Sequence, residues 1–196
     1  MIEIKETYHD LLDFVTDEYI SSLGDKSKGS YVLGYSRDPV FDFIPFTTIL
    51  SYLEYGSFLK NKPKKNKCIY VYKKDENEKI ARIEYWGKNE KLSWIELFDH
   101  DNNLSITIDS YGELLFISKI YKKNDIITDS ILINVDDINV HYHYIYTNDK
   151  IKEIDSFSFN EKNGFNSTTR LHVIYGEDGK ANIYYFNGSE KFFMLE

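Results

Sequence analysis

The chain has a single cysteine, Cys68, among its 196 residues, so no disulfide can form within it. This is typical of proteins from a reducing compartment. No stretch approaches the roughly 20 consecutive apolar residues that a membrane-spanning helix needs. The first residues show no charged segment followed by an apolar run, so we expect no signal peptide. Together these absences predict a cytoplasmic protein.

Basic residues are few relative to acidic ones. The chain has 24 Lys and Arg against 32 Asp and Glu, which gives a net charge of −8. Nucleic acids and anionic membranes both bind positive surfaces, so the charge argues against either of them as a general partner. The phosphate-binding pattern GxxxxGK[ST] and the dinucleotide-binding pattern GxGxxG are both missing. We therefore expect no nucleic acid, no membrane and no cofactor.

Tyrosine and phenylalanine are abundant, with 17 and 13 residues. Tyrosine suits a half-buried pleated surface, because its ring is apolar and its tip is polar. From residue 68 onward, alternating apolar and polar segments are separated by turn-forming pairs, at steps of roughly 9 to 16 residues. This spacing leaves no room for crossover helices, so neighbouring strands should pair antiparallel and largely in sequence. The predicted strands are 68–73, 79–86, 91–98, 104–109, 114–121, 126–135, 138–146, 151–159, 168–175, 181–187 and 191–195.

The first 60 residues have a different pattern. Residues 3–23 carry apolar side chains at spacings of three and four, typical of a helix, with Gly24 as its stop. Pro45 fits the first turn of a second helix through about Lys60, although Gly56 weakens that prediction. Residues 31–33 can form a short strand between the two helices. The lysine-rich stretch 60–67 indicates an exposed linker rather than a targeting or phosphate-binding patch.

The predicted fold class is therefore α+β, with N-terminal helices packed on a long antiparallel β-meander. So many strands in one open sheet twist strongly, so we expect either a twisted sheet or a partly closed barrel. We expect a single domain over residues 1–196, with a helical part (1–60) and a β-meander (68–196).

Three segments share an outline of an aromatic strand end, a polar turn, a lysine and the next strand: 70–80, 144–151 and 174–180. This outline resembles the hairpin units of bacterial tyrosine-rich YD repeats and of MORN-variant repeat proteins. Only Gly112, Gly179 and Gly188 stand where those repeats usually place a turn glycine. Some MORN-variant proteins are thought to be antitoxins or immunity proteins of polymorphic toxin systems, so the resemblance implies a protein that neutralises a toxin.

Acidic charge is concentrated at the N-terminus. Residues 1–25 contain seven acidic residues and one basic residue, whereas residues 61–196 have a net charge of only −3. On a helix, Glu6, Asp10, Asp13 and Asp17 would cluster on one side, where each neighbouring like-charge pair costs a few tenths of a kcal/mol. Carboxylates without lysine partners can dock a basic protein surface and steer its approach. The alternative is a solvated helix face.

Two patterns resemble metal sites. His141 and His143 point the same way from a predicted strand, but zinc needs three or four ligands, so we expect exposed sheet histidines. The segment 99–103 resembles the start of a calcium loop. Its sixth and twelfth positions are Leu104 and Ser110, where such a loop has Gly and Glu, so we expect a hairpin turn.

Catalytic arrangements are equally weak. Cys68 follows a run of lysines whose charge could activate a thiol, yet no histidine can be placed beside it, so we expect a buried strand cysteine. Glu84 and Glu96 lie on adjacent predicted strands and could in principle exchange protons. Because the chain is rich in carboxylates, such pairs also arise by chance.

From these observations we expect a protein-binding protein without a reaction of its own. Its predicted role is that of an intracellular immunity protein for a cognate toxin domain with a basic surface, such as a nuclease, bound through Glu6, Asp10, Asp13 and Asp17. We expect no catalytic residue and no metal. The alternatives are a ligand carrier or small enzyme that uses the interior of a curled sheet, and a structural repeat fragment. The sequence leaves the oligomeric state open.

Overall fold

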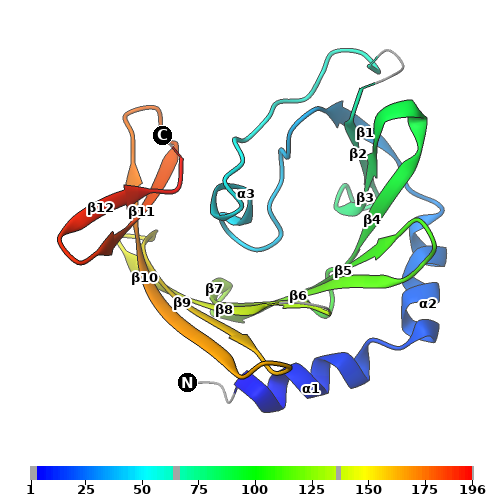
Figure 1. The fold of residues 1–196 in the computed structure, drawn as a ribbon. Coiled ribbons are helices and arrows are strands. Elements are labelled where there is room, and N and C mark those ends of the chain that lie inside the picture. Colours follow the sequence, from blue (N-terminus) through cyan, green and yellow to red (C-terminus); the bar gives the residue numbers. More distant parts are fainter. Residues whose placement is uncertain (1–3, 64–66, 136–137, 196) are drawn as a thin grey trace. The chain divides into compact units, whose positions relative to one another are not determined.

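The computed structural model describes residues 4–63, 67–135 and 138–195. Figure 1 shows the helices and strands in these residues. The helices are α1 (Ile4–Phe14), α2 (Asp17–Ser27), α3 (Thr47–Leu50) and the 3-10 helix η1 (Lys88–Glu90). The strands are β1 (Tyr31–Ser36), β2 (Ile69–Lys74), β3 (Ile80–Trp86), β4 (Leu92–Asp99), β5 (Leu104–Asp109), β6 (Leu114–Lys123), β7 (Ile126–Asn134), β8 (Asn139–Thr147), β9 (Lys150–Asn160), β10 (Phe165–Tyr175), β11 (Ala181–Asn187) and β12 (Glu190–Phe193).

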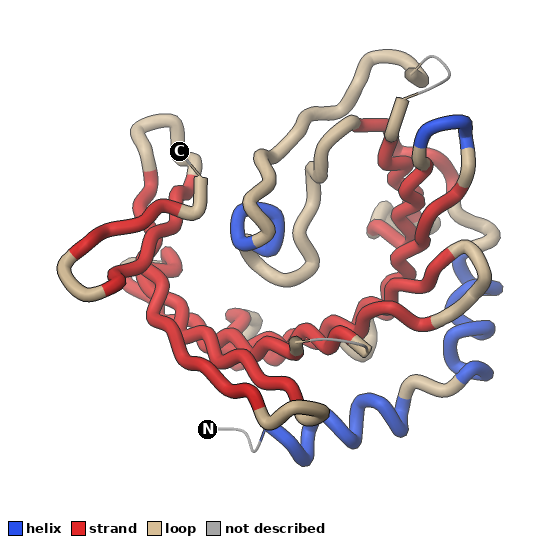
Figure 2. Tube along the Cα trace, viewed as in Figure 1, coloured by secondary structure: helices blue, strands red, loops and turns tan. Residues whose placement is uncertain are grey.

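Hydrogen-bonded neighbours in the sheet follow chain order from β1 to β12. Short turns join the strands from β2 onward, as Figure 2 shows, so successive strands run antiparallel. The α+β prediction with an antiparallel meander is confirmed. The meander is an open sheet, with β1 and β12 as its end strands.

The strand predictions are accurate because alternation and turn residues are local signals. Each predicted strand from residue 68 onward corresponds to one of β2 to β12, with ends that agree within three residues. Asn148 and Asp149 show the turn chemistry: their φ angles are 52° and 61°. Two consecutive positive φ values define the tight hairpin turn for which Asn and Asp are favoured. The predicted turn at 136–137 lies outside the described residues.

The single helix predicted over residues 3–23 is wrong, because α1 ends at Phe14 and α2 begins at Asp17. Thr16 lies between them in an extended conformation, with φ −83° and ψ 163°. Its Oγ1 accepts a hydrogen bond from the Tyr19 backbone N–H at 3.2 Å, which caps the new helix. Gly24 does not stop α2, which continues to Ser27.

The helix predicted from Pro45 to Lys60 is also wrong, since only α3 forms there. The Asp42 carboxylate accepts hydrogen bonds from Thr48, from its backbone N–H at 3.1 Å and its hydroxyl at 2.5 Å. Phe46 before α3 and Tyr52 after it have φ values of 67° and 58°. A left-handed residue on each side confines the helix to one turn.

The chain divides into two compact units, each described by itself below. Unit 1 comprises residues 1–40 and 56–117, and unit 2 comprises residues 41–55 and 118–196. The later boundary falls inside β6. The expectation of a single domain stays a prediction.

In unit 1, α2 packs against β4, and Figure 1 shows the two elements side by side. The helices contribute the buried apolar side chains of Leu11 and Leu23, and the link between them contributes Val15. The strands contribute Val71, Tyr72, Ile83, Leu97, Phe98, Leu104, Ile106 and Ile117. Burial of these side chains holds the helices on the sheet.

In unit 2, one hydrophobic core joins the α3 segment to the sheet from the end of β6 onward. Ile44 and Ile49 from that segment pack with buried side chains of the sheet. The sheet contributes Ile120, Tyr142, Tyr144, Ile151, Ile154, Leu171, Val173 and Ile183. Tyr142 and Tyr144 share the buried face of β8, as the alternation predicts.

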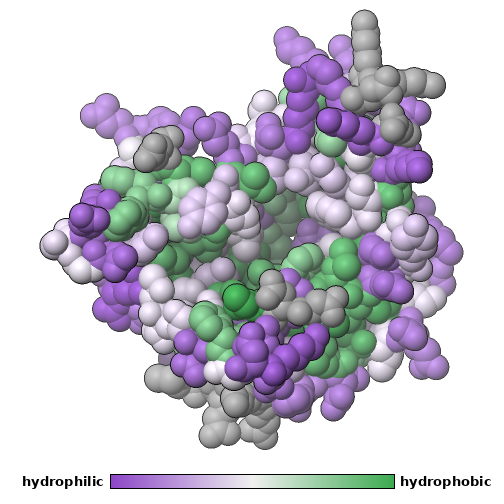
Figure 3. Space-filling view, viewed as in Figure 1, coloured by the Kyte–Doolittle hydropathy of each residue, from purple (hydrophilic) through white to green (hydrophobic). Residues whose placement is uncertain are grey.

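Some large apolar side chains stay exposed. Over β11 and β12, Phe186 is 53% exposed and Phe193 is 42% exposed. In Figure 3, apolar surface in this region, at the left of the view, lies between hydrophilic side chains. This part of unit 2 is amphipathic rather than uniformly polar.

Candidate functional site

The acidic residues predicted to bind a partner are divided between two helices. Asp10 and Asp13 lie on α1, and Asp17 is the first residue of α2. All three are exposed. The side chain of Glu6, in α1, lies outside the part that the structure describes. The four residues therefore do not form one continuous helical stripe.

The structure shows no ion pair for Asp10, Asp13 or Asp17 with any side chain that it describes. The sequence explains why, because no Lys or Arg occurs between Thr7 and Asp25. Glu18 is also exposed, and it follows Asp17 in the first turn of α2. The helix dipole favours acidic residues at that position, which offsets part of their mutual repulsion. We call Asp10, Asp13, Asp17 and Glu18 the acidic surface.

Asp25, the next acidic residue after Glu18, differs from the acidic surface because its charge is balanced by Lys28. Their side chains form an exposed ion pair, with Nζ and Oδ1 2.6 Å apart. An exposed pair of this kind contributes little stability, but it neutralises the local charge. The unbalanced negative charge therefore lies on the preceding segment.

Tyr19 fixes the helix that carries part of the acidic surface. Its hydroxyl donates to Asp99 Oδ2 at 2.5 Å, and Phe14 packs on its ring with centroids 4.7 Å apart. Burial and the neighbouring Asp99 raise the pKa of Tyr19, so the hydroxyl stays protonated. Burial opposes ionisation of Asp99, but the hydrogen bonds from Tyr19 and Asn102 outweigh it and lower the pKa of that carboxyl. The contact therefore joins a neutral phenol to a carboxylate.

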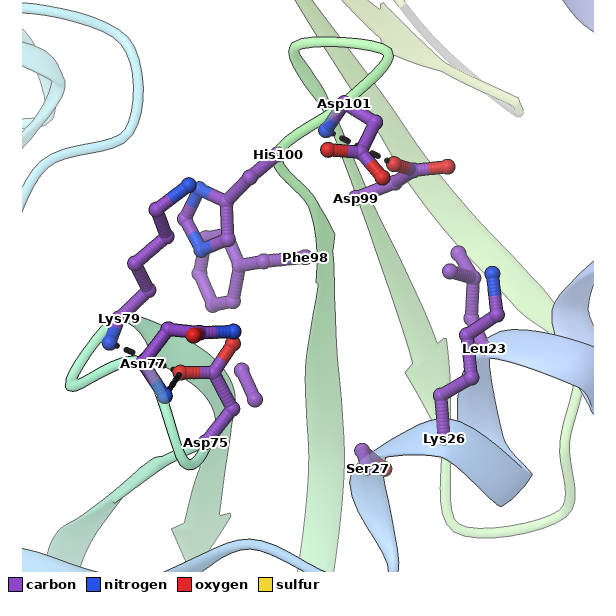
Figure 4. Close-up of a pocket in the computed structure, with 11 residues that line it drawn as sticks. Leu23, Lys26, Ser27, Asp75, Asn77, Lys79, Phe98, Asp99, His100 and Asp101 are labelled. Atoms are coloured by element: carbon purple, nitrogen blue, oxygen red, sulfur yellow. Dashed lines mark hydrogen bonds between the residues drawn. The ribbon is translucent and has the colours of Figure 1, made fainter.

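A pocket of about 190 Å³ lies beside α2 in unit 1 (Figure 4). Leu23 and Lys26 line it from α2, and the turn between β2 and β3 lines it from the opposite side. Phe98 and His100 lie between these two walls. His100 Nε2 donates to the Ile80 carbonyl at 2.7 Å, because a carbonyl oxygen can only accept.

Two acids of this pocket, Asp75 and Asp99, already have partners. Asp75 Oδ1 accepts the backbone N–H groups of Asn77 and Lys79 at 2.9 and 3.0 Å. Asp99 accepts from Asp101 in the same way at 3.1 Å. The volume is below the roughly 300 Å³ at which ligand pockets usually begin. The pocket therefore gives no support to the carrier or enzyme alternative.

The calcium-like segment 99–103 is the turn between β4 and β5. Asp99 accepts hydrogen bonds from the backbone N–H groups of Asp101 and Asn102, and Asn103 has a φ of 50°. The acidic side chain thus shapes the hairpin turn that we expect there. Nowhere in the described ranges do three His, Cys, Asp or Glu side chains converge as a metal site.

His141 and His143 do share a face of β8, but only one is exposed. His141 is 5% exposed, which contradicts the expectation of an exposed pair, and His143 is open to solvent. Both rings contact the same atom, Asp129 Oδ1, at 3.0 Å. Burial lowers the pKa of His141 despite its hydrogen bond to Asp129. The pair therefore belongs to a hydrogen-bonded cluster that the sequence does not predict.

The same face of unit 2 continues with charged side chains on β9 and β10. Arg170 binds Asp155 with two hydrogen bonds, 2.6 Å from Nε and 2.8 Å from Nη2. Glu153 lies within ion-pair distance of Arg170 at 3.5 Å and of His172 at 3.2 Å. The alternation of β9 and β10 places these residues on one face, but their pairing depends on strand register.

The remaining candidates are Cys68 and the pair Glu84 and Glu96. Cys68 is a free cysteine that is only half-buried and precedes β2, so the expectation of a buried strand cysteine is wrong. Glu84 is buried and bound by Lys73 at 2.5 Å and Arg82 at 2.8 Å. Glu96 pairs in register with Ile83, so its side chain lies on the face opposite Glu84. The two glutamates therefore cannot exchange protons directly. Of the lysine-rich stretch, residues 64–66 lie outside the described residues.

Comparisons with protein-family models, curated proteins and solved structures each returned no match. The described helices include none that is long and apolar enough to cross a membrane.

Proposed function

We propose that this chain is a non-catalytic protein-binding protein that docks a basic protein through its acidic surface. Its proposed role is that of an intracellular immunity protein for a cognate toxin domain, such as a nuclease. A nuclease presents a basic surface to phosphates, and an anionic partner competes for that surface.

One observation carries the proposal: the acidic surface is exposed and lacks ion pairs among the described side chains. Carboxylates that served to hold the fold together would be bound by the scaffold, as Glu84 and Asp155 are. Unpaired like charges cost stability on a helix, so they suit a surface that gains its counter-charges from a partner.

The test uses as its probe the product of the gene that neighbours this one, and a neighbouring product without a basic surface would count against the proposal. Asp10→Lys, Asp13→Lys and Asp17→Lys are combined in one variant. We expect this variant to bind the probe roughly tenfold or more weakly in titration calorimetry, because like charges would then face each other. Its affinity should also depend less on salt concentration than that of the unaltered protein.

The matched control combines Glu113→Lys, Glu177→Lys and Glu190→Lys, three exposed carboxylates elsewhere on the chain. This control changes the net charge equally and should keep the affinity within about twofold, because none of its three positions belongs to the acidic surface. Equal losses in both variants would mean that only net charge matters. A neighbouring gene product that binds neither variant nor the unaltered protein would remove the immunity role.

A further inference from the structure

Strands β10 and β11 are paired over only part of their length. Their pairing runs from His172 with Tyr184 to Tyr175 with Ala181. On its other side, β10 is paired with β9 from Phe165 to His172. Figure 1 shows β10 extending past the end of β11. Within the described part of unit 2, β10 and β11 therefore separate beyond the pair of His172 and Tyr184.

A pocket of about 360 Å³ lies where the two strands separate. Thr168 and Arg170 line it from β10, and Phe186 and Asn187 line it from β11. We call this pocket the β10–β11 cleft. Its volume lies within the range of small-molecule sites, which begins at roughly 300 Å³. Because the strands are joined at one end of the cleft, it suits a compact ligand better than an extended chain.

Both walls of the β10–β11 cleft carry backbone donors and acceptors. The Ile183 carbonyl accepts from the Met194 N–H at 2.8 Å, so the backbone groups of Ile183 face β12. Directions alternate along a strand, so the backbone groups of Tyr184 and Phe186 face β10. By the same alternation, those of Arg170 face β11. Since the strands are no longer paired at Arg170 and Phe186, these N–H and C=O groups can bind a ligand.

Phe186 gives the cleft an apolar surface. Its side chain is 53% exposed. The rings of His172 and Tyr184 each contact it in an edge-to-face arrangement, with centroids 5.6 Å apart, and hold it in position. Phe186 is two positions from Tyr184, so it lies on the face of the sheet that also carries His172 and Arg170. The ring can therefore stack against an apolar face of a ligand whose polar groups reach Arg170.

Charges beside the cleft are balanced. Arg170 donates two hydrogen bonds to Asp155, from Nε at 2.6 Å and from Nη2 at 2.8 Å. Glu153 lies 3.5 Å from Arg170, and Lys191 Nζ lies 3.7 Å from the centre of the Tyr184 ring. Two cations thus stand with two carboxylates, so the cleft favours neither an anion nor a cation. Arg170 has five N–H groups and uses two of them in the bonds to Asp155, which leaves donors for a neutral ligand.

We propose that the β10–β11 cleft binds a neutral saccharide, with one sugar ring stacked on Phe186 and its hydroxyl groups hydrogen-bonded to Arg170 and to the backbone of both walls. A sugar ring combines an apolar C–H face with hydroxyl groups that both donate and accept. It therefore matches an aromatic ring beside unpaired backbone groups. The cleft lies in unit 2 and the acidic surface lies on helices of unit 1, so this inference goes beyond the proposed function and does not depend on it.

The test uses the full chain labelled with nitrogen-15, and its probes are neutral trisaccharides of glucose, mannose, galactose and N-acetylglucosamine. We expect at least one of them to shift the backbone amides of Thr168, Arg170 and Phe186, with a dissociation constant of about 1 mM or lower. The trisaccharides of galacturonic acid and of glucosamine carry negative and positive charge. Both should bind no more tightly than the neutral probe, because the charges beside the cleft cancel.

Phe186→Ala removes the stacking ring, so we expect it to weaken binding of the same trisaccharide about tenfold or more. Phe186→Tyr keeps an aromatic ring and should bind within about twofold of the unaltered protein. Phe165→Ala is the matched control, because Phe165 is 44% exposed on β10 and does not line the cleft. This control should also stay within about twofold. The amide spectrum of each variant shows whether it is folded.

Three results would overturn the proposal. One is the absence of shifts at Thr168, Arg170 and Phe186 with every neutral trisaccharide at about 10 mM. Another is unchanged binding by Phe186→Ala. The third is tighter binding of adenosine than of every saccharide, which would make a nucleoside the ligand. Saccharide binding that persists in the Asp10→Lys, Asp13→Lys, Asp17→Lys variant would support the cleft separately from the proposed function.

Discussion

At the residue scale, alternation along a strand predicts the face on which a side chain lies but not its hydrogen-bond partner. His141 and His143 are two positions apart on β8. Because successive side chains on a strand alternate between its two faces, both histidines lie on the same face. Their shared partner, Asp129, depends on the register between β7 and β8. Tyr19 and Asp99 are 80 positions apart, and no local pattern in either segment indicates their hydrogen bond.

The buried His141 predicts a pH dependence of stability. Burial lowers its pKa in the folded state, although Asp129 opposes the shift. The unfolded chain therefore binds a proton more readily, and stability falls as the pH drops below about 6.5. Asp129 contributes in a lower window, because its folded-state pKa is lowered from 3.8. Between pH 7.5 and 5.5, urea unfolding should show stability falling as His141 is protonated in the unfolded chain.

His141→Asn should remove most of this loss, because the amide remains neutral over that pH range. His143→Asn replaces the exposed histidine on the same carboxylate oxygen and serves as the control, which should keep the loss. Identical pH profiles for His141→Asn and the unaltered protein would show that His141 is not the group responsible.

At the element scale, strands are predicted well and helices poorly. Strand ends are set by turn residues such as Asn148 and Asp149, whose backbone preference is local. In the predicted first helix, apolar spacing continues across Thr16, so periodicity alone misses the break. The run Thr16-Asp17-Glu18 is the signal that could have located it, because a capping residue followed by acids is typical of a helix start. The failure at α3 has a tertiary cause, since the Asp42 side chain organises that segment.

Thr16 provides a test at this scale. Thr16→Ala removes the oxygen that accepts the Tyr19 N–H, so we expect the free energy of unfolding to fall by about 1 kcal/mol. Thr16→Ser keeps the hydroxyl and should stay within about 0.5 kcal/mol of the unaltered protein. The measurement is chemical denaturation followed by circular dichroism. A loss of the same size for both substitutions would mean that the cap is not what Thr16 contributes.

At the scale of the whole molecule, the antiparallel meander is predictable because each strand pairs with the next one along the chain. The two compact units are not predictable in this way. Residues 41–55 belong to a hydrophobic core formed by strands that are distant in sequence. The packing of Ile44 in that core cannot be predicted from the residues next to it in the chain. The lack of lysine partners in the acidic surface is predictable from the sequence, but the division of its residues between two helices is not.

Net charge gives a further prediction for the whole chain. The isoelectric point of about 5.2 places the solubility minimum near that pH, since proteins associate most when net charge approaches zero. Each Asp→Lys change adds two positive charges, so the variant at Asp10, Asp13 and Asp17 carries −2 instead of −8. Light scattering across pH should show its maximum moving toward neutrality in this variant. A maximum that does not move would contradict the expectation that net charge sets the pH of strongest association.

The α3 segment has a consequence for how the protein is made. Ile44 and Ile49 leave the ribosome long before Ile183, which belongs to the same buried cluster. The ribosome synthesises the chain from its N-terminus, so these two apolar side chains lack their final packing partners during most of translation. The last hairpins therefore complete a core whose first pieces were synthesised near the beginning, and a stalled or shortened nascent chain would keep that early segment uncovered.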